Sequence, residues 1–374
     1  MKKLVFVVGA GRSGTSAITR ALQVLGVDLG DTLMQANPEF NRKGYFEDLE
    51  VFDFNNRLFE KIGSVWHDLN PVDLRCLAGR ELEDRCIDLL TRKLDKKEVF
   101  GLKDPQISRI IPFWSNIAHQ IDVADHYVIA LRHPLSVARS LARYTGFSIT
   151  RCFEIWYTFT LDALNASVIG RRVVISYENI LRSPAVEISR IAKIIGVPFD
   201  RNSALFRTYS ESFLDNADNH NNIDIIPSGD FKDLPVKVEK LYDFATKLAG
   251  EELDIDSQEA QATISQFQDS RKNDLSLVRL VSELDEKIAS FEHDFQVASE
   301  TIQSLIVDRD AYKAVVESQM PAEIAARDKQ IDELLKLVSE LNAARGTSEA
   351  CSVQAVAQEK STILRKILNL LLKK

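Results

Sequence analysis

Cysteine and histidine are scarce in this chain. Its 374 residues include four cysteines and six histidines. The cysteines lie far apart, with no C-x-x-C pair and no histidine cluster at the spacing of a zinc site, at Cys76, Cys86, Cys152 and Cys351. This usage is typical of reduced thiols in a cytosolic protein. The sequence therefore predicts neither a disulfide framework nor a bound metal.

Positive charge and long apolar runs are also in short supply. The chain carries 47 Lys and Arg against 55 Asp and Glu, a net charge of −8, which disfavours bulk binding to nucleic acid. No stretch approaches the roughly 18 apolar residues that cross a bilayer, and the apolar run at residues 4–8 is too short for a secretory signal. We expect a cytoplasmic protein without a nucleic-acid partner.

The opening of the chain holds its most informative pattern. The apolar run leads into a loop with three glycines at residues 9–16 and then into a helical pattern. In this order, backbone N–H groups and the positive end of the helix dipole point at one anion. Gly9 and Gly14 have the spacing of a P-loop, but Thr15 stands where a nucleoside-triphosphate site has its lysine, and Arg12 is the only cation of the loop. An ordinary tight turn between strand and helix is the alternative.

A second pattern follows the apolar run at residues 127–131. Arg132 ends this run, Pro134 begins a helical pattern, and Ser140 lies about two helical turns farther on. A P-loop NTPase would carry a Mg²⁺-binding carboxylate where Arg132 stands. An arginine and a hydroxyl so placed can grip a second phosphate, whereas a structural ion pair is the alternative for Arg132. The missing lysine and the missing carboxylate together predict a ligand with two anionic groups and no metal.

Residues 1–250 are predicted to form an α/β domain, with a P-loop-like parallel sheet flanked by helices. Short apolar runs alternate with helical patterns there, which is typical of βαβ units. The expected strands are apolar enough for a parallel sheet covered on both faces, at residues 4–8, 99–102, 127–131 and 173–176. The expected helices include residues 81–94, 134–144, 153–169 and 183–195.

The composition changes near Gly250, and residues 251–345 are predicted to form a helical coiled-coil region. Apolar residues recur there at alternating spacings of four and three, at Leu277, Val281, Leu284, Ile288, Phe291, Phe295, Ala298, Ile302 and Leu305. Pro321 interrupts the pattern, and a shorter seam follows at Ile324, Ile331, Leu334, Val338 and Leu341. Such seams indicate a coiled coil and, through it, a homo-oligomer. A long helix that folds back on the first domain is the alternative.

Residues 346–374 are predicted to be a polar linker followed by a short basic amphipathic helix. The helical pattern begins at Thr362, and such a helix could lie on an acidic membrane surface, at its inner face. Packing on a partner subunit or fraying in solution is an equal alternative.

The two phosphate-type patterns together resemble those of the sulfotransferases that use 3′-phosphoadenosine 5′-phosphosulfate (PAPS), in their bacterial and carbohydrate-type form. Residues 9–16 are similar to the 5′-phosphosulfate loop of that family, and Arg132, Pro134 and Ser140 match its 3′-phosphate motif. Residues 41–48, 101–105 and 176–181 are similar to further segments of bacterial members. Over about residues 1–250, the resemblance implies the sulfotransferase fold. It also implies transfer of a sulfuryl group from PAPS to a hydroxyl of a saccharide or glycolipid-type acceptor.

The resemblance further implies which residues form the site. The donor would be bound by Gly11, Arg12, Ser13, Gly14, Thr15, Ser16, Arg132, Ser140 and Tyr177. Sulfuryl transfer is an in-line displacement that needs a cation for the leaving phosphate and a base for the acceptor hydroxyl. We assign the cation to Arg12 and the base to Glu47, with Asp104, beside Lys103 at a strand end, as the runner-up. A carboxylate that complements a helix N-terminus is the alternative for Glu47.

The chain departs from the cytosolic small-molecule members of the family. Lys103, Asp104 and Pro105 replace their catalytic histidine segment, and their C-terminal R-K-G-x-x-G-D-W motif is at best a remnant at residues 228–231. These departures favour saccharide-type acceptors over phenols and steroids. His67 and His133 are within reach in principle, although a lone histidine is more often structural. Two other functions remain open: an atypical P-loop kinase that needs ATP and Mg²⁺, and a non-catalytic coiled-coil scaffold with a relic cofactor domain.

Overall fold

The chain divides by its contacts into a first unit, Met1–Leu280, and a second unit, Val281–Lys374. The computed structural model describes residues 1–37, 44–77, 79–166, 171–214, 234–316, 321–346, 362–363 and 365–366. The first unit extends past Gly250, where the composition changes, and includes the start of a long helix. The two units are described separately below.

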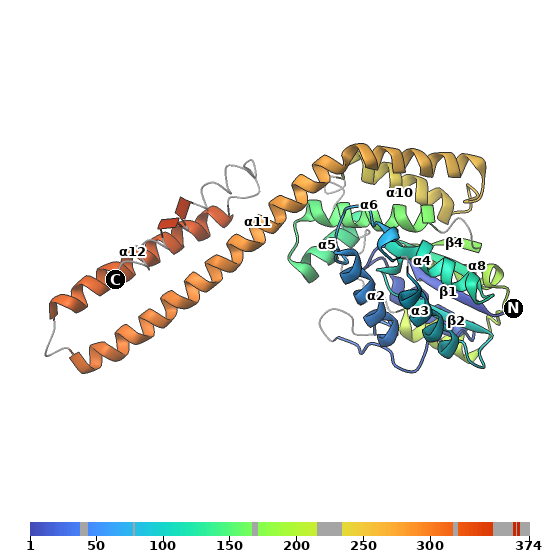
Figure 1. The fold of residues 1–374 in the computed structure, drawn as a ribbon, viewed down its shortest axis with the longest axis horizontal. Helices are drawn as coiled ribbons and strands as arrows, with labels where there is room; N and C mark the ends of the chain where they lie inside the picture. Colours follow the sequence, from blue (N-terminus) through green and yellow to red (C-terminus); the bar gives the residue numbers. More distant parts are fainter. Residues whose placement is uncertain are drawn as a thin grey trace. The chain divides into compact units, whose positions relative to one another are not determined.

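A four-stranded parallel sheet lies at the centre of the first unit (Figure 1). Its strands, in spatial order, are β2 (Val99–Lys103), β1 (Lys3–Val8), β3 (Ala124–Leu131) and β4 (Arg171–Ser176). All four strands expected from the apolar runs are confirmed: β1, β3 and β4 begin one to three residues earlier than expected, and β2 ends one residue later. Because the strands are parallel, their carboxyl ends share one edge of the sheet, which is where ligands bind in open α/β folds.

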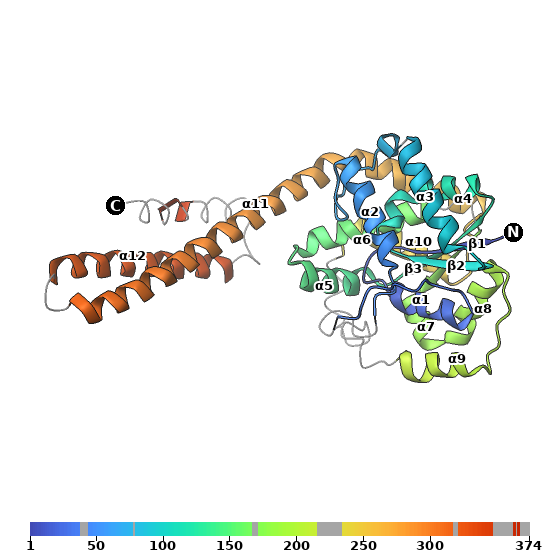
Figure 2. The same ribbon diagram turned by 60° about the horizontal axis from the view of Figure 1, so that its bottom comes forward.

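Helices cover both faces of this sheet, as the apolar strands require (Figure 2). One face packs against α1 (Thr15–Val24), α7 (Tyr177–Arg182), α8 (Pro184–Ile195), α9 (Ala204–Thr208) and the turn η2 (Tyr209–Phe213). The other packs against α2 (Leu49–Ile62), η1 (Leu74–Leu77), α3 (Arg80–Lys93), α4 (Ile107–Gln120), α5 (Pro134–Thr145), α6 (Ile149–Ala166) and α10 (Val236–Ala249). The four helices expected in residues 81–195 are confirmed, except that residues 167–169, the expected end of one of them, lie outside the described residues.

The long helix α11 (Gln258–Val316) begins in the first unit, where Ala260 and Ile264 join the core. Arg271 of α11 forms an ion pair of 2.5 Å with Asp162 of α6. Residues 258–280 are thus part of the α/β unit, although their composition belongs with the helical region that follows.

The second unit is a pair of helices from one chain, the end of α11 and α12 (Pro321–Gly346). The predicted interruption at Pro321 is confirmed, because Pro321 begins α12. Ala298 and Ile302 pack against Leu334 and Leu341, so the seam residues contact a helix of the same chain. Leu305, expected in the seam, is 40% exposed, and its neighbour Ile306 packs against this cluster instead. A coiled coil between chains is therefore not confirmed.

Most of the expected C-terminal basic helix, and the residues 228–231, lie outside the described residues. Within the described ranges, no helix is long and apolar enough to cross a membrane.

Candidate active site

The glycine-rich loop between β1 and α1 is tied to the start of α4. The hydroxyl of Ser108 accepts a hydrogen bond from the backbone N–H of Gly9 at 2.8 Å, and it lies 3.2 Å from the carbonyl oxygen of the same residue. Pro105 lies 3.9 Å from the position that a Cβ on Gly11 would take. These contacts place the end of β2 and the start of α4 directly beside the loop. Ser108 was not anticipated from the sequence, because no motif marks it.

Arg12 joins the loop to the second predicted motif. Its Nε donates to the hydroxyl of Ser140 in α5 at 2.9 Å. Arg132, at the end of β3, donates from Nη1 to the carbonyl oxygen of Arg12 at 3.2 Å. The two patterns, more than a hundred residues apart in sequence, therefore form one site. Burial lowers the pKa of Arg12 and of Arg132, and the charge of Arg132 lowers that of Arg12 further, but a guanidinium stays charged in proteins.

Tyr177, the first residue of α7, lies at the carboxyl end of β4, at the same edge of the sheet as Arg132. The guanidinium carbon of Arg132 lies 4.4 Å from the centre of the Tyr177 ring, a distance typical of a cation–π contact. Gly14 adopts a left-handed φ of 83°, and a Cβ at this residue would lie 2.2 Å from the Tyr177 ring. Only glycine lets the loop pass this close to the ring while keeping that backbone conformation.

The loop also holds a polar atom that needs a partner. The Ser13 hydroxyl is fully buried and has no hydrogen-bond partner within the described part of the chain. Ser16 donates to the carbonyl oxygen of Tyr45 at 3.3 Å, which fixes the segment before α2 against the loop. A buried hydroxyl without a partner is costly, and an oxyanion in the loop would provide the missing acceptor. The residues present thus fit an anionic ligand.

Glu47 and Lys103 form a buried ion pair beside the loop. Lys103 Nζ lies 2.5 Å from Glu47 Oε1, and the two side chains are 3% and 8% exposed. The other oxygen of Glu47, Oε2, is buried without a hydrogen-bond partner in the described residues. The helix-capping role considered for Glu47 belongs to Asp48, whose side chain accepts from the N–H groups of Glu50 and Val51.

Asp104 is held by a network that leaves neither of its oxygens unbonded. Asn55 Nδ2 donates to Oδ2 at 2.8 Å, and the backbone N–H of Gln106 donates to Oδ1 at 2.9 Å. The indole of Trp114 in turn donates to Asn55 Oδ1 at 3.0 Å. Burial raises the pKa of Asp104 to about 6, and the nearby charge of Glu47 is the second contribution to this shift.

Asn55 is a site residue that motif reasoning missed, although the sequence carries a signal for it. The buried residues of α2 are Val51, Phe54, Asn55, Leu58 and Phe59, which is the spacing of an apolar helix face. One amide on such a face predicts a buried hydrogen-bonding role. The sequence alone does not say that its partner is Asp104, because that contact spans 49 positions of the chain.

The two histidines considered earlier have structural contacts. His133 caps α5, its Nδ1 accepts from the N–H of Leu135 at 3.3 Å, and burial lowers its pKa to about 4. His67 Nδ1 lies 2.9 Å from Arg151 Nη2. No group of three or more His, Cys, Asp or Glu side chains is placed for a metal among the residues described. The absence of a metal remains a prediction.

The chain is similar to a known protein family and to solved structures. A family model described as "Sulfotransferase family" matches residues 5–201, more than half of the chain. The structure is similar to the sulfotransferase domain from the curacin biosynthetic pathway, at 14% identity and a TM-score of 0.37, over 66% of this chain and 98% of that one. It is also similar to the sulfotransferase domain from the Synechococcus PCC 7002 olefin synthase, at 17% identity and a TM-score of 0.35, over 71% of this chain and 95% of that one. No curated protein matches the chain. The matched region holds β1 to β4 with the loop, Arg132 and Tyr177, and the chain belongs to the sulfotransferase family.

Proposed function

We propose that this sulfotransferase moves a sulfuryl group from PAPS to a hydroxyl of a saccharide or glycolipid-type acceptor, without a metal. The observation that carries the proposal is the junction of Arg12 with Ser140 and Arg132. It puts two guanidiniums and a helix N-terminus at the carboxyl edge of one sheet. A donor with two separate anionic groups is complementary to that arrangement.

The loop and the second motif divide the binding of the donor between them. Residues 11–16 and the Arg12 side chain would hold the 5′-phosphosulfate, with Ser13 gaining its missing acceptor. Arg132 and Ser140 would hold the 3′-phosphate, with Tyr177 supporting Arg132. The donor supplies the sulfuryl group and a phosphate leaving group. Arg12 stabilises the negative charge that develops on that phosphate, since a preorganised cation in a half-buried site needs little reorganisation.

Glu47 is assigned as the base that accepts the proton of the acceptor hydroxyl. Lys103 holds Oε1 of Glu47 and leaves Oε2 without a partner, so one carboxylate oxygen can take the proton. Both oxygens of Asp104 already accept hydrogen bonds. We therefore assign Asp104 to positioning, through its buried network next to Glu47.

A saccharide-type acceptor is supported by the chemistry beside Glu47. Lys103 and Asp104 stand where the cytosolic small-molecule members of the family, from which this sequence departs, have their catalytic histidine segment. Tyr45 is half-buried, its backbone carbonyl oxygen accepts a hydrogen bond from Ser16 of the loop, and burial raises its pKa. An amphipathic ring in the segment that leads to Glu47 is suited to pack on a sugar while its hydroxyl hydrogen-bonds. The expected contact of residues 362–374 with an acidic membrane would suit a glycolipid and remains a prediction.

Calorimetric titration with adenosine 3′,5′-bisphosphate, with and without Mg²⁺, tests the donor assignment. We expect metal-independent binding that Arg132→Gln weakens by about 10- to 100-fold, the scale of a lost charged hydrogen bond. Mg²⁺-dependent binding of ATP instead would favour the kinase. Unchanged binding in Arg132→Gln would refute the 3′-phosphate assignment.

Turnover with sulfate-accepting saccharides separates an enzyme from a scaffold. We expect Glu47→Gln to abolish most turnover while leaving binding of the bisphosphate intact, because Glu47 acts on the acceptor. Donor binding with no turnover on any saccharide or glycolipid would contradict the acceptor class.

A further inference from the structure

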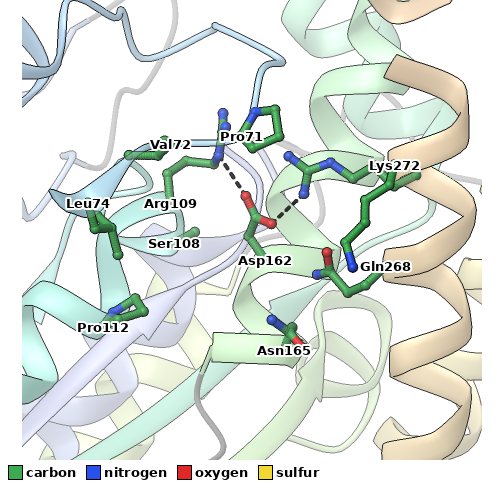
Figure 3. A pocket seen from close by; sticks show the side chains of 11 residues that line it. Pro71, Val72, Leu74, Ser108, Arg109, Pro112, Asp162, Asn165, Gln268 and Lys272 are labelled. Carbon is green, nitrogen blue, oxygen red and sulfur yellow. Dashed lines mark hydrogen bonds and ion pairs between the residues drawn. The ribbon is translucent and has the colours of Figure 1, made fainter. Parts of the chain in front are cut away.

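A pocket in the first unit adjoins the site described above through Ser108, which hydrogen-bonds to Gly9 of the loop and also lines this pocket. It is a cavity of about 230 Å³ between α4, α6, the first part of α11 and the segment at residues 71–74 (Figure 3). Its volume is below the roughly 300–1,000 Å³ of pockets that take drug-sized ligands. A ligand for this pocket must therefore be small.

Two buried guanidiniums share one carboxylate in this pocket. Asp162 Oδ2 lies 2.7 Å from Arg109 Nε, and Asp162 Oδ1 lies 2.5 Å from Arg271 Nη1. Figure 3 shows the side chains of Arg109 and Asp162 pointing toward one another in this pocket. Asp162 is the one acidic residue among those that line the cavity, and the third cation, Lys272, pairs with exposed Asp269 at the rim.

The two arginines differ in how many of their side-chain N–H groups have a partner within the protein. Arg109 also donates from Nη1 and Nη2 to the carbonyl oxygens of Asp68 and Asn70, so each of its three side-chain nitrogens faces an oxygen. Burial lowers the pKa of Arg109, and Arg271 adds to this effect, while Asp162 and the Asp68 carboxylate oppose it. Arg271 makes one hydrogen bond within the described residues, from Nη1. Its remaining N–H groups are available to a ligand.

Gln268, one helical turn before Arg271 on α11, carries a second available donor. Its Nε2 is buried and has no hydrogen-bond partner in the described part of the chain. Leaving such a donor unsatisfied costs about 1–3 kcal/mol, so native proteins seldom do so without a ligand or water. Pro71, Val72 and Pro112 form an apolar wall of the same cavity.

We propose that this pocket binds a small organic oxyanion, a sulfate, phosphate or carboxylate group on a short apolar body. The oxyanion accepts from Gln268 Nε2 and the unused N–H groups of Arg271, and the apolar body packs against the proline wall. A purely structural ion-pair network would explain the Asp162 contacts but leaves the buried Gln268 amide unsatisfied. This proposal does not depend on the proposed function, because its donors lie on α11 and not in the glycine-rich loop.

Calorimetry on the full chain tests the pocket with three probes: propyl sulfate, butyrate and inorganic sulfate. Gln268→Met keeps the length of the side chain and removes the donor, and no side-chain hydrogen bond is lost with it among the residues that the structure describes. We expect this variant to bind propyl sulfate about 10-fold more weakly, the value of one hydrogen bond to a charged group. Lys61→Gln, which removes one exposed positive charge from α2, should bind as the unchanged protein does.

The same titrations separate this pocket from the donor site. The proposal is supported if Arg132→Gln binds propyl sulfate as the unchanged protein does and Gln268→Met binds it more weakly. Propyl sulfate should also bind more tightly than inorganic sulfate, because only the former uses the apolar wall. The proposal is overturned if no probe binds at millimolar concentration. It is also overturned if Gln268→Met binds propyl sulfate as tightly as the unchanged protein does, or if inorganic sulfate binds as tightly as propyl sulfate.

Discussion

Both the backbone and the side chain of Arg12 make hydrogen bonds within the site. Its φ of 69° is left-handed, which costs a non-glycine residue roughly 1–2 kcal/mol. In this conformation its carbonyl oxygen accepts a hydrogen bond from Arg132, and its Nε donates one to Ser140. Strain of this kind persists where the surroundings fix the residue, and it is common at functional sites.

Replacing Arg12 by alanine should lower turnover by roughly 10²–10³, the scale of one transition-state charge donor. Arg12→Lys keeps a charge but loses the directed contact with Ser140, so we expect an intermediate loss. Steady-state kcat with a saccharide acceptor measures both. Normal turnover in Arg12→Ala would remove this residue from the mechanism.

Asn55 and Asp104 should behave as a matched pair. In Asp104→Asn an amide N–H faces the Asn55 amide, and in Asn55→Asp a carboxylate faces Asp104. The double variant, Asn55→Asp with Asp104→Asn, restores one donor and one acceptor and still offers Trp114 an acceptor. We expect a favourable coupling of about 1–3 kcal/mol in a urea-unfolding cycle. Additive effects would contradict the hydrogen bond.

The raised pKa of Asp104 gives a pH-dependent contribution to stability. Its folded value of about 6 lies above the unfolded value of 3.8, so the folded chain binds more protons between these values. The contribution is therefore fully present below pH 3.8 and is lost as pH rises through about 6. The unfolding free energy of the unchanged protein minus that of Asp104→Asn should fall from pH 5 to pH 7. A difference independent of pH would contradict the shift.

At the scale of elements, apolar runs predict the sheet well because parallel strands are buried on both faces. The helices follow for a similar reason, since their capping residues and apolar faces are local features. The sequence motifs predicted one part of the site, the two phosphate-type patterns that bring Arg12, Ser140 and Arg132 together. The Asn55–Asp104 contact was not predictable, because it depends on how α2 packs on the end of β2. The partner of the heptad seam was equally undetermined, since a heptad pattern does not say whether the facing helix belongs to the same chain.

The turn from the loop into α1 should tolerate no side chain at Gly14. Gly14→Ala forces a Cβ against the Tyr177 ring in addition to the cost of a positive φ. Gly26→Ala is the matched control, because Gly26 has a φ of 73° and no atom within 4 Å of its Cβ position. We expect about 1–2 kcal/mol of destabilisation in the control and a larger loss, with weaker bisphosphate binding, in Gly14→Ala. Urea unfolding and calorimetry measure the two effects, and equal losses would argue against the Tyr177 contact.

At the scale of the whole molecule, the catalytic machinery and the helical pair belong to different units. Every residue assigned to the site lies before Leu280. The second unit has its own small cluster, yet Val297, Leu305 and Leu335 remain 40–48% exposed. Self-association through such residues remains a prediction from the heptads.

A chain that ends at Leu280 should therefore keep the fold and the bisphosphate affinity of the full chain, within about threefold. Sedimentation of the two chains tests the role of the second unit. We expect the full chain to form a homo-oligomer and the shortened chain to be a monomer. A monomeric full chain would refute the homo-oligomer, and lost donor binding in the shortened chain would show that the first unit is not independent.

The junction at Arg12 limits how this site can be rebuilt in another protein. A glycine-rich loop is described by a motif that contains only the spacing of its own residues. Here the carbonyl oxygen of Arg12 accepts from Arg132, the residue that follows β3, and its side chain donates to Ser140 of α5. A transplant of residues 9–16 alone would leave a strained arginine with neither anchor. A transferred loop therefore needs at least Arg132 and Ser140 beside it.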